Sequence, residues 1–152
     1  MDLNIKKIND TVFRICDKNN KILKISIPSI NAPFGIENFT ANLEINMSKS
    51  HHSQLLGDLY KLDNYLEKYI HDIDKTIIWQ SSIKKRENWH HMLKTRIAKK
   101  GLECYKNNSY ISIYDINLKN DCSIEITLQS MWLRNNYAGI IWEIKKIKEL
   151  IN

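Results

Sequence analysis

Apolar and polar residues alternate along several short stretches of this chain, a pattern typical of strands that bury one face. The clearest run covers residues 39–47, and its apolar members are Phe39, Ala41, Leu43, Ile45 and Met47. Residues 122–128 alternate in the same way. Shorter apolar or β-branched runs predict further strands at 12–16, 22–27, 76–83, 110–114 and 139–147. Strands should therefore dominate the fold.

A different period governs residues 53–74, where apolar side chains recur at steps of three and four. This spacing predicts an amphipathic helix whose apolar stripe packs on the sheet. The stripe consists of Leu55, Leu59, Leu62, Leu66, Tyr69 and Ile73. Acidic residues on the other face make the helix an unfavourable place for nucleic acid. The same stripe could instead pair two copies of the chain, so a homo-oligomer through the helix stays open.

The expected order is three strands, the helix, a strand, a basic segment and three strands. The turn formers of residues 17–20 predict a hairpin between the first two strands. Closing a short antiparallel sheet into a barrel removes its exposed edges, and the OB-fold is a small barrel of this kind. We therefore expect residues 1–152 to form a single OB-like domain, mainly β with an inserted helix. A split antiparallel sheet with helices on one face is the alternative.

Positive charge is concentrated in residues 84–106. The chain has a formal net charge of +6, and this segment alone carries that surplus, because eight of its residues are Lys or Arg and two are Glu. A basic helix over residues 85–100, ended by Gly101, and a long basic loop are both compatible with its sequence. An excess of this size predicts a polyanionic partner.

Aromatic residues lie among these cations, and that combination suits single-stranded nucleic acid, which offers both phosphates and flat bases. If Ile111 and Ile113 are buried in a strand, Tyr110 and Tyr114 project together from its other face, about 7 Å apart. The alternatives are that these tyrosines pack beneath a helix and that Trp89 lies in a buried helix stripe. The candidate phosphate contacts are Lys84, Lys85, Arg86, Lys94, Arg96, Lys99 and Lys100, and the candidate stacking residues are Trp89, Tyr110 and Tyr114.

Chain length, apolar runs and cysteine content indicate how many domains to expect and in which compartment the protein works. A chain of 152 residues fits one domain. Its start lacks a signal-peptide pattern, and no run approaches the ~20 apolar residues of a membrane span. Three widely spaced cysteines argue against a disulfide framework and for a reducing compartment. We therefore expect an intracellular protein without a membrane partner.

The sequence offers little for metal binding or catalysis. The histidine pairs at 51–52 and 90–91 are adjacent in sequence, so their side chains diverge, and no motif frames a tetrahedral site. No cofactor is expected. The nearest catalytic candidate is Glu143 with Lys145, downstream of Asp115 or Asp121, an arrangement that some metal-dependent nucleases use. Glu-x-Lys is common by chance in a lysine-rich chain, so we expect no enzyme, and a nuclease is kept as a third alternative.

Two segments resemble the small OB-fold single-stranded DNA-binding proteins of large DNA viruses and phages. They are residues 32–39, which lead into an alternating strand, and residues 132–147, in which Gly139 leads the last strand. The resemblance implies base stacking on exposed aromatics between basic loops, with DNA replication or recombination as the setting. The chain departs from the replicative type because it ends in 148–152 without an acidic tail.

These observations predict a protein that binds single-stranded DNA without strong sequence preference, with single-stranded RNA as the alternative ligand. The alternative class is a structural or protein-interaction factor, for example in viral assembly or host binding, in which the basic face has no nucleic-acid role. A viral origin would place either protein in the host cytoplasm or nucleus.

Overall fold

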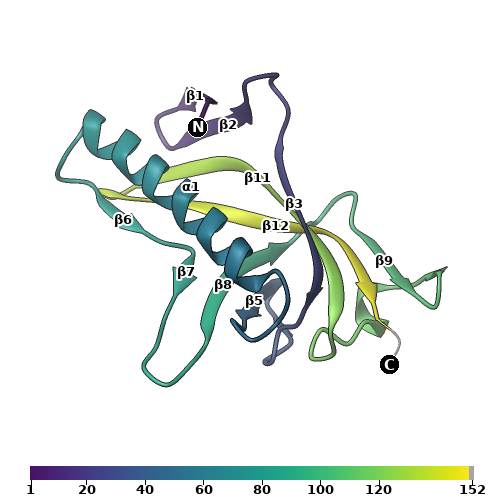
Figure 1. Ribbon diagram of the computed structural model, residues 1–152. Helices are drawn as coiled ribbons and strands as arrows, with labels where there is room; N and C mark the ends of the chain where they lie inside the picture. Colours follow the sequence, from purple (N-terminus) through teal and green to yellow (C-terminus); the bar gives the residue numbers. More distant parts are fainter. Residues whose placement is uncertain (151–152) are drawn as a thin grey trace.

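The computed structural model describes residues 1–150 and consists of one helix and one mixed sheet (Figure 1). In chain order its elements are β1 (Leu3–Asn9), β2 (Val12–Asp17), β3 (Leu23–Ile30), β4 (Ile36–Glu37), β5 (Thr40–Ile45), α1 (His52–Ile73), β6 (Ile78–Gln80), β7 (Ile83–Lys84), β8 (His91–Ile97), β9 (Glu103–Lys106), β10 (Ser109–Tyr110), a 3₁₀ turn (Ile113–Asp115), β11 (Cys122–Arg134) and β12 (Tyr137–Glu149). No helix within these described residues is long and apolar enough to cross a membrane.

The β11–β12 hairpin forms the centre of the sheet. Each strand has 13 residues, about twice the usual length, and the pair crosses the whole molecule in Figure 1. Asn135 and Asn136 join the strands with φ of 51° and 68°. A two-residue hairpin turn needs positive φ at both positions, and asparagine tolerates that conformation better than most residues.

Shorter strands cover both edges of this hairpin in series. Along β12, β6 pairs near its start, β8 at its centre and β9 at its end, and all three run parallel to it. Along β11, β2 and β3 pair one after the other in antiparallel register. The sheet is mixed because residues 78–106 advance along β12 in its own direction.

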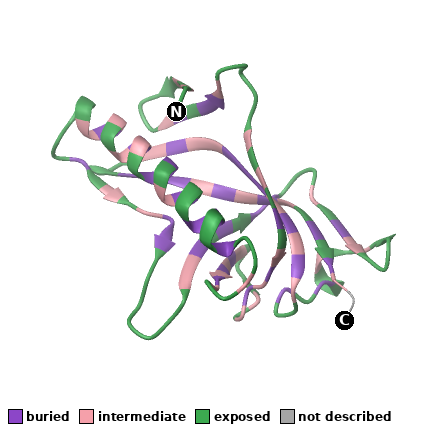
Figure 2. Cartoon of the chain, viewed as in Figure 1, coloured by how far each residue is buried: buried purple, intermediate pink, exposed green. Residues whose placement is uncertain are grey.

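The helix α1 covers one face of the sheet and closes the core. Its buried side chains include Leu59, Leu66 and Ile70, and they share a hydrophobic cluster with Leu93 and the fully buried Trp142. Figure 2 shows the buried positions of the helix on the side toward the sheet and the exposed ones on the other. The apolar stripe is therefore covered within the chain, and pairing of two copies through α1 stays a prediction that would have to use its polar face.

The start of the helix is held by a buried histidine. The imidazole of His52 accepts a hydrogen bond at Nδ1 from the backbone N–H of Asn46, at 3.0 Å. Its Nε2 lies 2.7 Å from the carbonyl oxygen of Ser29 and donates to it, because the other nitrogen is the acceptor. His52 thus ties the helix to the segments that follow β5 and end β3, and both its ring nitrogens are occupied.

The prediction of a mainly β fold with one inserted helix is confirmed, and the helix lies within one residue of the predicted range. The OB-like barrel is not confirmed. Across residues 1–150 the strand order begins at β1 and ends at β4, and these two strands do not pair, so the sheet stays open. The alternative was right in placing the helix on one face, but wrong in expecting a purely antiparallel sheet.

Three local predictions are wrong. Residues 12–16 and 22–27 do not form a hairpin with each other: β2 pairs with β1 and β11, and β3 pairs with β11. Residues 85–100 form no helix; the alternative of a basic loop holds for residues 85–90 only, and β8 occupies the second half. Residues 110–114 form no continuous strand, because β10 ends at Tyr110 and a 3₁₀ turn follows, in which Ser112 Oγ accepts a hydrogen bond from the N–H of Tyr114.

Candidate nucleic-acid interface

The face of the sheet that points away from α1 is polar and basic, and we call it the outer face. Along β8, Leu93, Thr95 and Ile97 are buried beneath the helix, so the intervening residues Lys94 and Arg96 point outward. On the neighbouring strand β5, Asn42 lies opposite Lys94 and Thr40 opposite Arg96. Lys84 of β7 adds a third outward cation beside them.

These three cations, Lys84, Lys94 and Arg96, form what we call the basic row. The ion pairs found among residues 1–150 are Lys7–Asp10, Lys24–Glu125 and Lys49–Asp121, and none of them involves the basic row. Two residues along a strand span about 6.6 Å, so Lys94 and Arg96 can reach neighbouring phosphates of an extended strand. Glu143 of β12 lies beside Arg96 in the strand register, but no ion pair among residues 1–150 joins them, so all three cations can meet an external anion.

A hollow of about 340 Å³ lies over the basic row. All three cations line it, together with Thr40, Ser82, Trp132 and Ile141. A second hollow of about 460 Å³ shares Lys84 and Lys94 with the first and extends to Phe34, Arg86 and Trp89. The two hollows are therefore neighbours on the outer face, with Lys84 and Lys94 between them.

An exposed aromatic pair borders the second hollow. Trp89 lies on the loop between β7 and β8, and Phe34 lies on the loop before β4. Their rings are stacked, with centroids 5.6 Å apart and planes inclined by 29°, although 59% of Phe34 and 45% of Trp89 remain exposed. The Arg86 guanidinium lies 5.7 Å from the Trp89 ring centroid. This arrangement offers a flat apolar surface beside positive charge, as stacking of a base requires.

The loop that carries Trp89 is built around Lys85. The ammonium group of Lys85 donates hydrogen bonds to the carbonyl oxygens of Arg86 and Trp89, and Asn88 takes a left-handed conformation with φ of 64°. Every residue of this loop from 85 to 90 is exposed (Figure 2). Lys85 therefore shapes the loop, whereas Arg86 and Trp89 face the hollow.

His91 adds little positive charge to this region at neutral pH. Burial, with smaller contributions from the charges of Lys85 and His90, lowers the pKa of His91 below its ordinary value of 6.5. Its ring packs edge-on against Tyr60 of α1, with centroids 5.9 Å apart. The positive charge near the hollows comes from lysine and arginine.

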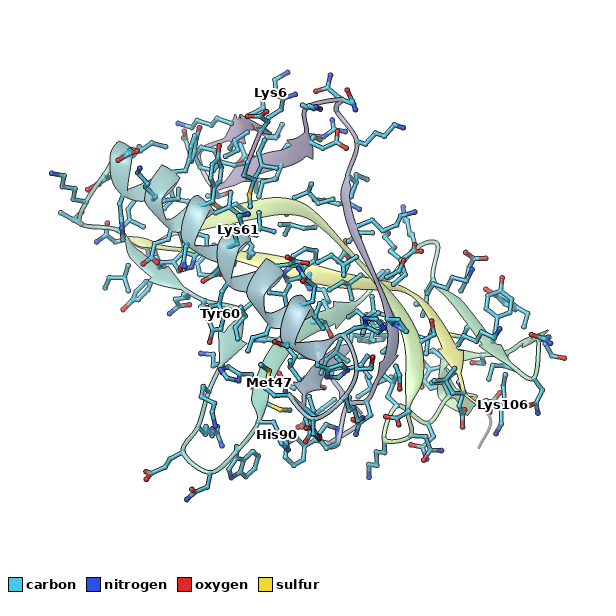
Figure 3. The ribbon with its side chains drawn as sticks, in the orientation of Figure 1. Lys6, Met47, Tyr60, Lys61, His90 and Lys106 are labelled. Carbon is cyan, nitrogen blue, oxygen red and sulfur yellow. The ribbon has the colours of Figure 1, made fainter. Side chains whose placement is uncertain are left out.

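The remaining predicted residues lie elsewhere. Lys99 and Lys100 belong to the connection from β8 to β9, where the carbonyl oxygen of Lys100 accepts a hydrogen bond from Lys145 Nζ at 3.3 Å. In Figure 3, His90 marks the β7–β8 loop and Lys106 lies at a distant end of the molecule. The basic segment 84–106 is thus spread along the sheet rather than gathered on one helix or loop.

Tyr110 and Tyr114 are exposed as predicted, at 67% and 86%, but the strand that was to align them is absent. Tyr110 stands edge-on to Tyr105, with centroids 5.6 Å apart, and its hydroxyl donates to the carbonyl oxygen of Leu102. Tyr114 borders a separate apolar groove with Phe39 and Ile113. Within residues 1–150 the two rings do not contact each other, so they do not form one platform.

Sequence reasoning missed two aromatic residues at the two hollows, Phe34 and Trp132. Phe34 stands in the loop sequence Pro33-Phe34-Gly35, and a large apolar residue in such a loop is a signal for an exposed side chain. Trp132 gave no comparable signal, because its place depends on the β11–β12 register. Trp142, by contrast, belongs to the core, since it is 1% exposed.

The candidate nuclease residues are dispersed. Asp121 forms an ion pair with Lys49, and the next residue, Cys122, lies opposite Glu149. Glu143 is six residues from that point along β12, which corresponds to about 20 Å. Lys145 lies at an irregularity in the strand register and donates to Lys100. Among residues 1–150, no three His, Cys, Asp or Glu side chains converge as metal ligands would.

Comparison with protein-family models, with curated proteins and with solved structures finds no match to this chain. The candidate interface is therefore defined by its own chemistry: a row of cations without an ion pair among residues 1–150, two neighbouring hollows and an exposed pair of stacked rings.

Proposed function

We propose that this protein binds single-stranded nucleic acid on the outer face of its sheet, without strong sequence preference. The observation that carries the proposal is the exposed Phe34–Trp89 pair beside Lys84, Lys94 and Arg96, which form no ion pair within residues 1–150. Phosphates need the cations and unpaired bases need the rings. A duplex would satisfy only the first requirement, because its bases are already stacked on one another.

Weak sequence preference follows from the types of contact. Aromatic rings accept any base, because every base has a flat face, and lysine and arginine contact phosphates that are the same in every sequence. Of the neutral hydrogen-bonding side chains at the two hollows, Thr40 and Asn42 lie directly opposite cations, where they suit phosphate oxygens as well as base edges.

The proposal differs in two respects from the one based on sequence. The binding residues are Lys84, Arg86, Trp89, Lys94 and Arg96 with the addition of Phe34, while Lys85 supports the loop. Lys99, Lys100, Tyr110 and Tyr114 line neither hollow and are not part of the proposed interface. The resemblance to OB-fold proteins of viruses and phages suggests a role in DNA replication or recombination, but the open sheet offers no closed barrel in support.

An intracellular, reducing setting forms part of the proposal. Cys16, Cys104 and Cys122 are buried and free. Burial raises the pKa of the Cys104 thiol and, with the nearby charges of Glu149 and Asp121, raises the pKa of Cys122 to about 12. Thiols of this kind stay protonated and react slowly, so they are compatible with packing as reduced core residues.

A binding titration tests the proposal. Fluorescence anisotropy of labelled single-stranded DNA, duplex DNA and single-stranded RNA should show tighter binding of the single strands than of the duplex. Lys94→Gln with Arg96→Gln should weaken that binding, whereas Lys61→Gln should not, because Lys61 lies on α1 across the sheet (Figure 3). Equal affinity of all three proteins for every probe would remove the basic row from the interface.

A protein-interaction role is the second candidate, and a specific surface favours it. An apolar groove of about 490 Å³ is lined by Ile36, Phe39, Ile97, Ile113 and Tyr114, among others. Phe39 has φ of 59°, an unfavourable conformation for a bulky residue, yet 53% of it is exposed. Size measurement of the free protein, together with the binding titration, separates the two candidates.

A further inference from the structure

The two neighbouring hollows of the outer face share Lys84 and Lys94 and differ at their other ends. The Phe34–Trp89 end lies on exposed loops and is open to solvent. The other end is bordered by Trp132 and by Gln80 and Ser81 of the β6–β7 segment. A strand that lies beside Trp89 and follows Lys84 and Lys94 therefore reaches Trp132.

The packing at Gly139 fixes the position of the Trp132 ring. A Cβ atom at this position would lie 2.9 Å from the six-membered ring of Trp132 and 2.7 Å from the carbonyl oxygen of Gln80. Glycine thus lets the indole lie directly against the backbone of β12, beside β6. The ring is held in place there, and its half-buried position leaves part of it available to a ligand.

Three cations line the hollow that Trp132 borders. Its volume of about 340 Å³ lies at the small end of ligand sites. Lys84, Lys94 and Arg96 all line it, its lining includes no carboxylate, and Thr40 and Ser82 add hydroxyl groups. An internal phosphodiester carries one negative charge, whereas a terminal phosphomonoester carries about 1.5 to 2 at pH 7. Three cations around one small hollow match the terminal group better.

We propose that this hollow receives the phosphorylated end of a single strand, with the terminal phosphate on the basic row and the terminal base against Trp132. The inference rests on the proposed function and assigns a specificity to the same site. The strand leaves the hollow past the Phe34–Trp89 pair, which stacks a base nearer the interior of the strand.

The test compares short oligothymidylates that carry a 5′-phosphate, a 3′-phosphate or neither. One phosphorylated form should bind about tenfold more tightly, since an added charge-assisted contact contributes about 1.4 kcal/mol. The ratio of affinities should fall toward one between pH 7.5 and pH 5, because the second ionisation of a phosphomonoester has a pKa near 6. Arg96→Gln should abolish the preference, and Trp89→Ala should weaken all the probes by the same factor.

The outcomes distinguish failure of end recognition from failure of the proposed single-strand binding. Binding of all oligonucleotides with equal affinity would overturn end recognition and leave single-strand binding intact. Absence of binding by any of them would overturn both. A preference that survives in Arg96→Gln and in Lys94→Gln would place the phosphate elsewhere. Displacement by thymidine monophosphate, without any preference among the oligonucleotides, would assign the hollow to a free nucleotide and would also overturn the proposal.

Discussion

Replacing Trp89 with alanine tests the stacking pair most sharply, because the ring lies outside the hydrophobic core. Trp89 is 45% exposed and its neighbour Phe34 is 59% exposed, so a base can cover either ring. Stacking contributes roughly 1–3 kcal/mol per base, which corresponds to an affinity loss of about 5- to 150-fold. The free energy of unfolding should change by less than about 0.5 kcal/mol, as is usual for surface positions.

The assay measures single-strand affinity and thermal stability for Trp89→Ala, Phe34→Ala and the double variant. Because the two rings pack against each other at 5.6 Å, their losses should not add, and the double variant should lose less than the sum. Tyr114→Ala is the matched control, since that ring is 86% exposed but lies at the apolar groove. The reasoning fails if Tyr114→Ala weakens binding as much as Trp89→Ala does, or if Trp89→Ala leaves affinity unchanged.

Three further predictions concern phosphate contacts, strand cleavage and a buried carboxyl group. With Lys84, Arg86, Lys94 and Arg96 as phosphate contacts, a plot of log affinity against log salt should have a slope near −3, and a flat plot would exclude phosphate contact as the main interaction. Labelled strands incubated with Mg²⁺ or Mn²⁺ should stay full length, and products that disappear in Glu143→Gln would reveal a nuclease. Burial raises the pKa of Asp63 above its ordinary value of 3.8 despite hydrogen bonds from Trp79 and Ser81. The contribution of protonated Asp63 to folding stability is therefore complete below pH 3.8 and is lost as pH rises through the folded-state pKa. Asp63→Asn should accordingly melt at a higher temperature than wild type at pH 7, and this difference in melting temperature should narrow toward pH 4. A difference that stays constant with pH would contradict this reasoning.

The elements that sequence predicted correctly are those with a strong local period. The helix repeats apolar residues every three or four positions over 22 residues, and β5 alternates buried and half-buried side chains along its whole length. Both patterns depend only on neighbours in sequence. The parallel pairing of β12 with β6, β8 and β9 joins segments at least 40 residues apart, and no local pattern encodes it.

The failed helix at 85–100 shows how two periods compete. Trp89, Leu93 and Ile97 are spaced by four and suggest a helix stripe, while Leu93, Thr95 and Ile97 are spaced by two and suggest a strand. The strand forms because β5 and β12 pair with β8 on its two sides. Those partners cannot be identified from the segment alone.

The candidate site was predictable in its charge but not in its geometry. The surplus of lysine and arginine in residues 84–106 is visible in the sequence, and four of its members border the two hollows. Phe34, however, precedes Trp89 by more than 50 residues, and Trp132 follows it by more than 40. These rings lie near the basic row only because strands distant in sequence pair with one another. The basic and aromatic residues of one sequence segment could therefore not reveal their positions.

Photochemical cross-linking tests the central claim most directly, because it reports which side chain touches a base. A single strand that carries 5-iodouracil is irradiated on the protein, and the attached residue is located by mass spectrometry. The proposed interface predicts attachment at Trp89 or Phe34, and at Trp132 when the modified base is at the phosphorylated end. Attachment mainly to Tyr60 or other residues of α1, or to Tyr110 and Tyr114, would contradict it.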